Sequence, residues 1–271
     1  MTERIDSPAN KKIKLAASLH NRKSRDKEGL FIVEGVRLAE MAAASSWEIV
    51  FGLCTRTAAA EPRVQKILAA LAARQCPVYE TDEDIYKKAA ATVAPQGLLL
   101  VMKQQQTSLR QVLSAEEQPL LLVLDGLQDP GNAGTMIRTA DAAGCSGVVF
   151  LTDTVDLFSD KTVRSTMGSL FHLPIAVQVE RQDLLAALQA KKVRLLVTAL
   201  DETACQHFAV DYREGAAVVF GNEGNGVSQE LLAAAEKKLY IPMLGEAESL
   251  NAATAAAVVL YEALRQRIHS Q

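Results

Sequence analysis

The sequence lacks a long apolar run, and this absence bears on membrane insertion. Its longest apolar stretches, such as LLLVL at 120–124, fall far short of the roughly 20 residues that a membrane-spanning helix needs. Residues 1–30 are dominated by Lys, Arg and Asn, without the charged-then-apolar order of a secretory leader. We therefore expect no membrane association and no secretion signal.

Cysteine is scarce, and its spacing points to neither zinc nor redox chemistry. The four cysteines are Cys54, Cys76, Cys145 and Cys205, without the paired spacing of a metal-binding or disulfide-exchange motif. The sequence also shows no cluster of His, Cys and Asp that would suggest a metal site. It favours a reduced, cytoplasmic chain that needs no metal and uses cysteine as a small apolar residue.

Acidic residues outnumber basic ones overall, but the excess is unevenly distributed. The formal net charge is −3, whereas residues 1–27 contain eight Lys or Arg against three acids, a net of +5 that leaves −8 for the remainder. Such asymmetry is typical of a protein with a polyanionic partner. Charge alone also allows a solvated basic helix face near the terminus.

The pattern of residues predicts a small α/β domain over 1–102, followed by a linker. β-rich runs alternate with helical patterns from about Gly29 onward. Residues 103–118 are polar and rich in Gln, so we place the linker there. The expected strands are 30–33, 49–53, 78–79 and 98–102, and the expected helices are 36–44, 61–75 and 82–91.

A second α/β domain is expected over 119–271. The continuous apolar run at 120–124 is typical of a strand that is buried on both faces of a parallel sheet. Further strands are expected at 148–151, 195–199, 218–220 and 239–241, and helices at 133–143, 161–169, 183–190, 229–235 and 252–268.

Three loops stand out because each follows a predicted strand, where ligands usually bind in parallel α/β sheets. The first, DGLQDPGNAG at 125–134, leads into a helix for which Asn132 is a good N-cap. Arg138 lies in an otherwise small and apolar part of that helix, about 9 Å along the axis from the loop. A solvated surface arginine remains the alternative.

The second loop, GNEGNG at 221–226, has neither the glycine order of a dinucleotide fingerprint nor the Lys-Ser/Thr ending of a P-loop. Glu223 is an unusual charge there, although a flexible connection with an exposed carboxylate would explain it. The third loop, IPMLGEAESLN at 241–251, precedes an alanine-rich helix. Its Ser249 and Asn251 are both N-cap residue types, and two are more than one helix needs.

Together the three loops resemble the three motifs of the SpoU (TrmH-like) RNA ribose methyltransferases of the SPOUT superfamily. KTVRSTMGSLFHLP at 161–174 is typical of the same family. SPAN at 7–10, Ile13-Lys14 and FIVEGVR at 31–37 are similar to the substrate-binding extension of its ribosomal-RNA members. The resemblance extends over nearly the whole chain apart from the linker, and three motifs in order at the family's spacing are a specific signal.

The resemblance implies a C-terminal SPOUT-type α/β domain with a deep trefoil knot, plus a smaller N-terminal α/β substrate-binding domain. It also implies a homodimer packed through the knotted domain, ribosomal RNA as the partner and S-adenosylmethionine as the cofactor. The cofactor is expected in the knot, held largely by backbone groups around Gly221, Ile241 and Leu250. Met243 lies near them in the sequence, and Thr198 is a further candidate at the end of an earlier strand.

By the same resemblance, Asn132, Arg138, Glu223, Ser249 and Asn251 form the catalytic site. A guanidinium with a pKa above about 12 is a poor base, so we expect Arg138 to stabilise the developing alkoxide or to clamp a phosphate. The proton would then pass to phosphate or water. Glu223 would orient Arg138 or the substrate, while Ser249 and Asn251 would fix the ribose and the loop.

The chain departs from the family at Ala252-Ala253, where Val-Ser is frequent, which weakens the case for a functional hydroxyl at the helix start. Hydrolase chemistry is disfavoured because no Gly-x-Ser-x-Gly motif is present and His20, His172, His207 and His269 lie outside the three loops. A non-catalytic RNA-binding relative and an enzyme for another adenine nucleotide remain alternatives. The added first domain favours ribosomal over transfer RNA.

Overall fold

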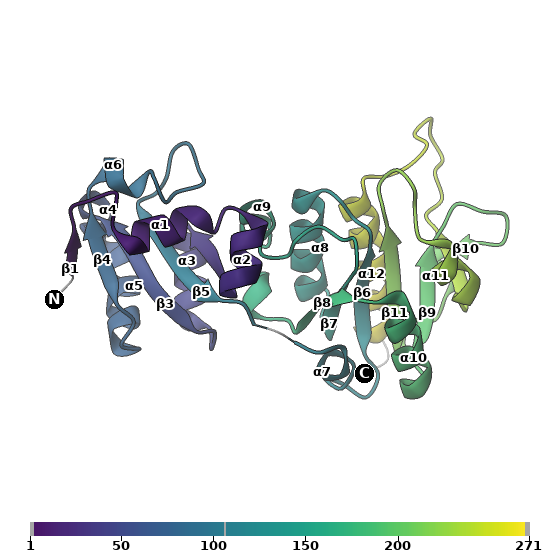
Figure 1. Ribbon diagram of the computed structural model, residues 1–271. Helices are drawn as coiled ribbons and strands as arrows, with labels where there is room; N and C mark the ends of the chain where they lie inside the picture. Colours follow the sequence, from purple (N-terminus) through teal and green to yellow (C-terminus); the bar gives the residue numbers. More distant parts are fainter. Residues whose placement is uncertain (1–2, 106, 269–271) are drawn as a thin grey trace. The chain divides into compact units, whose positions relative to one another are not determined.

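The structure is a computed structural model that describes residues 3–105 and 107–268 (Figure 1). The chain forms two compact units, Met1–Gln105 with Phe158–Phe171 and Gln106–Leu157 with His172–Gln271. Residue 106 of the expected linker and His269 lie outside the described residues. Both units combine a β-sheet with helices, which confirms the α/β class.

The first unit is built on a five-stranded mixed sheet in the order β1-β4-β3-β5-β2. Strands β1, β4 and β3 are parallel, whereas β5 runs antiparallel to both β3 and β2. All four strands predicted in this region are confirmed, and the short β1 at the sheet edge was not predicted. The bounds are β1 (Glu3–Ile5), β2 (Leu30–Glu34), β3 (Ile49–Thr55), β4 (Val78–Thr81) and β5 (Leu98–Lys103).

The first two helices of this unit begin at side-chain caps. Asn10 and Asn21 accept backbone N–H bonds at the starts of α1 and α2. The prediction of one helix over 82–91 is wrong in length, because α6 ends at Tyr86. Beyond the turns that follow, Ala91 N donates to the buried Glu34 carboxylate at 2.9 Å. The bounds are α1 (Lys11–Ser18), α2 (Arg22–Glu28), α3 (Val36–Ala44), α4 (Arg56–Ala59), α5 (Pro62–Ala73) and α6 (Glu83–Tyr86).

Phe158–Phe171 packs within the first unit, although the sequence suggested that the whole of 119–271 forms one domain. Phe158 lies against Phe31, with ring centroids 4.9 Å apart, and Phe171 lies edge-on to Trp47 at 5.4 Å. Gly168 has φ +100°, a backbone conformation that favours glycine, and a Cβ there would also lie 2.1 Å from Met41 Sδ. The segment contains α9 (Asp160–Ser165) and a 3-10 turn at Ser169–Phe171.

The second unit contains a seven-stranded, fully parallel sheet in the order β10-β12-β9-β11-β6-β7-β8. The five predicted strands are confirmed, while β8 and the two-residue β10 were not predicted. The bounds are β6 (Leu120–Asp125), β7 (Gly147–Leu151), β8 (Ile175–Val179), β9 (Arg194–Thr198), β10 (Cys205–Gln206), β11 (Ala216–Gly221) and β12 (Lys237–Tyr240).

Helices cover both faces of this sheet. Side chains of β6 alternate between the faces, and Leu121 and Val123 share a core with α7, α10 and α11. On the opposite face, α8 and α12 pack against each other beside β6 and β11. The bounds are α7 (Leu109–Leu113), α8 (Pro130–Ala142), α10 (Arg181–Lys191), α11 (Gln229–Ala234) and α12 (Ala252–Ile268).

α7 lies inside the expected linker and begins with a capping box formed by Ser108 and Gln111. No helix among residues 3–105 and 107–268 is both long and apolar enough to cross a bilayer.

Candidate active site

The first two loops meet where β6 and β11 end side by side. Asp125 and Gly221 are paired in register at the carboxyl ends of these strands, so the loops that follow start next to each other. The helix after the first loop begins one turn earlier than predicted. Asp129, and not Asn132, is the N-cap of α8, and its side chain accepts the Asn132 N–H at 2.8 Å. The Asn132 side chain is therefore left for other partners.

Glu223 joins the second loop to the first. Its carboxylate accepts hydrogen bonds from Gln128 N at 3.1 Å, Asp129 N at 3.2 Å and Asn132 Nδ2 at 3.0 Å. Burial raises the pKa of Glu223, but the hydrogen bonds from Asn132 and the backbone amides outweigh it and hold the pKa below its ordinary value. Glu223 therefore holds the first loop. The structure shows no hydrogen bond between Glu223 and Arg138 among the described residues, and orientation of the substrate by Glu223 stays a prediction.

Asn251 joins the third loop to the same network. Its Nδ2 donates to Asn132 Oδ1 at 3.0 Å, and its Oδ1 accepts Ala253 N at 2.9 Å at the start of α12. Asn251 is thus a helix cap, as predicted, and at the same time a link to α8. The result is a chain of hydrogen bonds from Glu223 through Asn132 to Asn251 that ties three sequence-distant loops together.

A cavity of about 670 Å³ opens beside this chain, within the usual range for a small-molecule site. The second and third loops and the end of β9 line it. Every residue that the resemblance assigned to the cofactor lies on its wall, namely Thr198, Gly221, Ile241, Met243 and Leu250. Glu223, Ser249 and Asn251 line it too. Asn132 and Arg138 are not among the lining residues.

The cavity wall offers mainly backbone and apolar groups. A Cβ at Gly221 would lie 2.2 Å from the Gly226 carbonyl carbon, so the loop closes this tightly only with glycine there. The side chain of Asn222 accepts N–H bonds from Gly224 and Asn225, each at 2.9 Å, which fixes the turn from within. The Thr198 hydroxyl is already used, because it donates to Val219 O at 2.9 Å.

Arg138 stands apart from the network. Its side chain is exposed and makes no hydrogen bond or ion pair with the part of the chain that the structure describes. At 3.6 residues per turn, it lies about 120° around α8 from Asn132. Ser249 is also exposed, on the loop before α12. The structure thus brings Asn132, Glu223 and Asn251 into contact and leaves Arg138 facing solvent.

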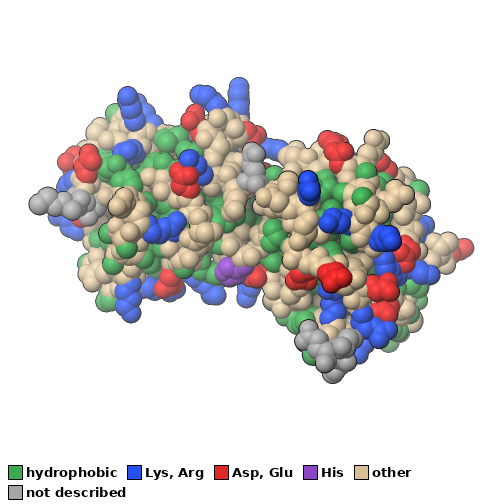
Figure 2. Space-filling model, turned by 90° about the horizontal axis from the view of Figure 1, so that it is seen from below, with side chains coloured by type: hydrophobic (Ala, Val, Ile, Leu, Met, Phe, Trp, Pro, Cys, Tyr) green, Lys and Arg blue, Asp and Glu red, His purple; other side chains and the backbone are tan. Residues whose placement is uncertain are grey.

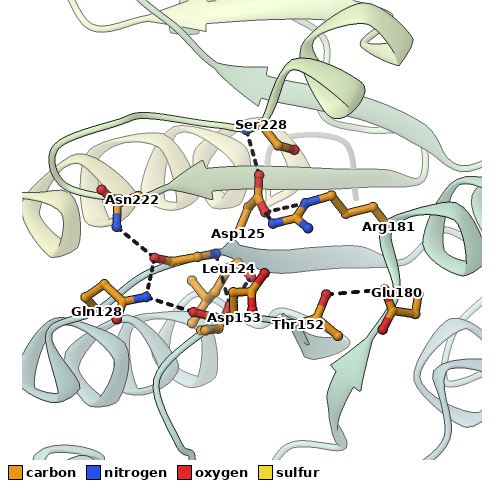
Figure 3. A network of polar contacts seen from close by, with 11 residues as sticks. Leu124, Asp125, Gln128, Thr152, Asp153, Glu180, Arg181, Asn222 and Ser228 are labelled. Atoms are coloured by element: carbon orange, nitrogen blue, oxygen red, sulfur yellow. Dashed lines mark hydrogen bonds and ion pairs between the residues drawn. The ribbon is translucent and has the colours of Figure 1, made fainter.

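An ion pair beneath the loops was not predicted from the sequence (Figure 3). Asp125, whose side chain is 2% exposed, accepts two N–H bonds from Arg181, from Nε at 2.9 Å and from Nη2 at 2.7 Å. Its second oxygen accepts Ser228 N at 2.8 Å. The sequence could have indicated Asp125, because a charged residue at the end of a buried strand is unusual. Arg181, 56 residues further along the chain, gave no such indication.

Gln128 and Asn222 hold the start of the first loop (Figure 3). Gln128 Nε2 donates to Gly126 O at 2.9 Å and to Asp153 O at 2.7 Å, while Asn222 Nδ2 donates to Gly126 O at 2.9 Å. Within residues 3–105 and 107–268, no group of three or more His, Cys, Asp or Glu is arranged to hold a metal ion.

Sequence comparison identifies the class of protein. The model of the SpoU rRNA Methylase family matches residues 119–261, and the MRM3-like substrate binding domain matches residues 10–100. The chain therefore belongs to the SpoU rRNA methylase family, which confirms the resemblance read from its three loops.

Individual relatives match over almost their full length. The chain is 37% identical over 259 residues to the 23S rRNA (guanosine(2553)-2′-O)-methyltransferase RlmP of Bacillus subtilis, covering 96% of this chain and 98% of the relative. The AdoMet-bound rRNA methyltransferase from Sinorhizobium meliloti has a TM-score of 0.86 at 32% identity, covering 97% and 98%. The SpoU methyltransferase AviRb from Streptomyces viridochromogenes, in complex with AdoMet, has a TM-score of 0.86 at 29% identity, covering 96% and 100%.

Proposed function

We propose that the protein transfers a methyl group from S-adenosylmethionine to a ribose 2′-hydroxyl in ribosomal RNA. The observation behind this is the hydrogen-bonded chain of Glu223, Asn132 and Asn251 beside a ligand-sized cavity. Family membership and relatives named as 23S rRNA 2′-O-methyltransferases support it.

The cavity suits the cofactor. Its volume fits a nucleoside-sized ligand, and its glycine and apolar lining leaves backbone N–H and C=O groups to recognise an adenine. We assign Thr198, Gly221, Ile241, Met243 and Leu250 to this role. When bound, S-adenosylmethionine supplies a methyl group that its sulfonium has already activated.

The residues around the cavity divide the remaining work. Glu223, Asn132 and Asn251 fix the three loops, so the reacting groups are held at one place and the entropic cost of aligning them falls. We assign ribose binding to Ser249, which is exposed on the cavity wall. Arg138 stabilises the developing alkoxide or clamps an adjacent phosphate, because a planar guanidinium presents several N–H donors in a fork that matches phosphate oxygens.

The first unit recruits the RNA in this proposal. Lys11, Lys14 and Lys23 on α1 and α2 are exposed and form no ion pair with any residue in 3–105 or 107–268. Blue basic side chains are scattered among red acidic ones on the face shown in Figure 2, without one continuous basic field there. Local clusters, such as the one on α1 and α2, would therefore supply the phosphate contacts.

Family resemblance also supports a homodimer, a trefoil knot in the second unit and a cytoplasmic location. Phe208 and Tyr261, each 50% exposed in that unit, offer apolar surface for packing between subunits. All four cysteines are free, which suits a reducing compartment. Sedimentation equilibrium would test the dimer directly, and a monomer at micromolar concentration would contradict it.

Calorimetric titration with S-adenosylhomocysteine, followed by mapping of 2′-O-methylation in ribosomal RNA, tests the function. We expect binding at about micromolar Kd, no binding of NAD or ATP, and one new methylated ribose. Tight NAD binding without a response to S-adenosylhomocysteine would end the methyltransferase proposal. Cofactor binding without methylation of any RNA would leave a non-catalytic relative.

A further inference from the structure

The buried ion pair of Asp125 and Arg181 has no assigned role, although it lies directly under the loops (Figure 3). Asp125 is the last residue of β6, and Arg181 is the first residue of α10. Asp125 Oδ1 accepts both N–H bonds from Arg181, and Oδ2 accepts the Ser228 amide at 2.8 Å. Neither side chain lines the cavity.

We propose that Asp125 and Arg181 are positioning residues that close the base of the cofactor loop, residues 221–228. This inference rests on the proposed function, because it assigns the loop to S-adenosylmethionine. The loop leaves the sheet at Gly221, which is paired in register with Asp125, and it returns at Ser228, whose N–H binds the Asp125 carboxylate. One residue therefore stands at both ends of the loop, through its backbone beside Gly221 and through its side chain at Ser228.

Other contacts hold the tip of the same loop. Asn222 donates to Gly126 O at 2.9 Å, and the Glu223 carboxylate accepts the Gln128 and Asp129 amides. Residues 125–129 thus hold the loop at its base and at its tip. If the base opened, the backbone between them would shift, and that backbone forms a wall of the cavity.

The hydrogen bonds at the base of loop 221–228 require a carboxylate at position 125. Three N–H donors converge on Asp125, two from Arg181 and one from Ser228, and only a group with two acceptor oxygens satisfies them all. An asparagine there would direct an NH₂ group at one of these donors. Arg181 in turn neutralises a carboxylate that would otherwise be buried without a counter-charge.

The experiment measures S-adenosylhomocysteine affinity of the full-length chain by calorimetry, well below the melting temperature of each variant. We expect Asp125→Asn and Arg181→Met each to weaken binding about tenfold. The double variant should bind no worse than the weaker single variant, because the two side chains act as one unit. RNA affinity should be unchanged in all three.

A proline at position 228 tests the hydrogen bond from the Ser228 amide to Asp125 separately from the ion pair. Ser228 has φ −58°, which proline adopts without strain, so Ser228→Pro deletes the N–H and leaves the ion pair in place. Ser228→Ala, which keeps the N–H, is its reference. We expect the proline variant to bind S-adenosylhomocysteine about tenfold more weakly than the alanine variant.

Arg194→Met is the matched control for lost stability. Arg194 in β9 donates to Glu236 Oε1 and to Asp211 O, each at 2.7 Å, and its side chain is 18% exposed against 22% for Arg181. It should lower the melting temperature without changing the Kd. Wild-type Kd in the Asp125 and Arg181 variants, or equal weakening in Arg194→Met, would overturn the positioning role. Failure of the wild-type protein to bind would instead overturn the proposed function.

Discussion

The polar side chains assigned to the candidate active site fall into two groups that differ in their hydrogen bonds. Glu223, Asn132 and Asn251 are held by hydrogen bonds from the chain's own loops. Arg138 and Ser249 are exposed and have no such bond within residues 3–105 and 107–268. The first group ties together the loops beside the cavity, while the second group makes no hydrogen bond with these loops and is available to a bound substrate.

The difference follows from what each group must recognise. A small-molecule cavity gains affinity when its walls are fixed before binding, because less ordering is needed at the moment of binding. Cations that await a polyanion gain from staying unpaired, because an internal acid would compete with phosphate. We infer that the cofactor side is preorganised and that the RNA side is completed by its substrate.

The largest expected effect tests the exposed group. Arg138→Ala should fold and bind cofactor normally, because the exposed side chain makes no hydrogen bond or ion pair with the described residues, whereas methyl transfer should fall on the order of a hundred- to a thousandfold. Arg138→Lys should also be poor, since an ammonium cannot make the planar two-pronged contact. Single-turnover methylation at saturating cofactor measures the loss.

Near-normal turnover in Arg138→Ala would remove this side chain from the active site. The loops would then define a cofactor pocket only. Arg138 would no longer count as an exposed side chain that the RNA substrate engages.

The next effect concerns the preorganised group. Gly221→Ala places a Cβ 2.2 Å from the Gly226 carbonyl carbon, so the loop backbone must move. Overpacking typically costs about 1–3 kcal/mol, and about 1.4 kcal/mol corresponds to tenfold in affinity, so we expect cofactor affinity to fall between about tenfold and a hundredfold. Calorimetry with S-adenosylhomocysteine measures it. Gly245→Ala, where a Cβ meets nothing within 4 Å, is the control.

Wild-type affinity in Gly221→Ala would show that the loop adapts freely. The distinction between a rigid cofactor side and an open RNA side would then fail on the cofactor side.

Helices and strands could be predicted from the sequence more reliably than the contacts that individual side chains make. Strand β6 and the alanine-rich α12 were found because their residue patterns are local, and the residues lining the cavity were found because the loop motifs are specific. The N-cap of α8 was misplaced because Asp129 and Asn132 are both good caps three residues apart, and only the fold shows which one faces the helix start.

Contacts between distant residues were beyond local patterns. Nothing near Arg181 indicates that it pairs with Asp125, because a helix and a strand that are 56 residues apart meet only in the folded sheet. The packing of Phe158–Phe171 in the first unit was missed for the same reason. Short apolar segments such as β8 also give too little periodicity to be distinguished from a loop.

A smaller effect is expected from the open cations of the first unit. Changing Lys11, Lys14 and Lys23 together to Gln should weaken RNA binding. The slope of log K against the logarithm of the salt concentration should become shallower by about two, because fewer counterions are released. Cofactor affinity should not change. The charge-matched control changes Lys27, Lys87 and Lys103, which pair with Glu28, Asp84 and Glu48. An equal loss of salt dependence in both triple variants would contradict an RNA contact made specifically by the unpaired Lys11, Lys14 and Lys23.

The smallest expected effect concerns His20, a potential cation of the first unit that does have partners. Its Nδ1 lies 2.8 Å from Asp160 Oδ2, and its Nε2 lies 2.9 Å from Ala89 O. The hydrogen bond to Asp160 raises the pKa of His20 above its ordinary value despite partial burial. Because the folded pKa is the higher one, this contribution to stability is complete below the unfolded pKa of about 6.5 and is lost as pH rises through the folded pKa.

His20→Gln should therefore lower the melting temperature by about 2 °C at pH 6 and by less at pH 9. Thermal unfolding at the two pH values measures this, and Asp160→Asn added to His20→Gln should cost little more, because the pair is already broken. A loss of the same size at both pH values would mean that His20 acts as a neutral hydrogen-bonding group. His20 would then not be a cation that is paired with an acid of its own chain. It would differ from Lys11, Lys14 and Lys23 only in being less exposed.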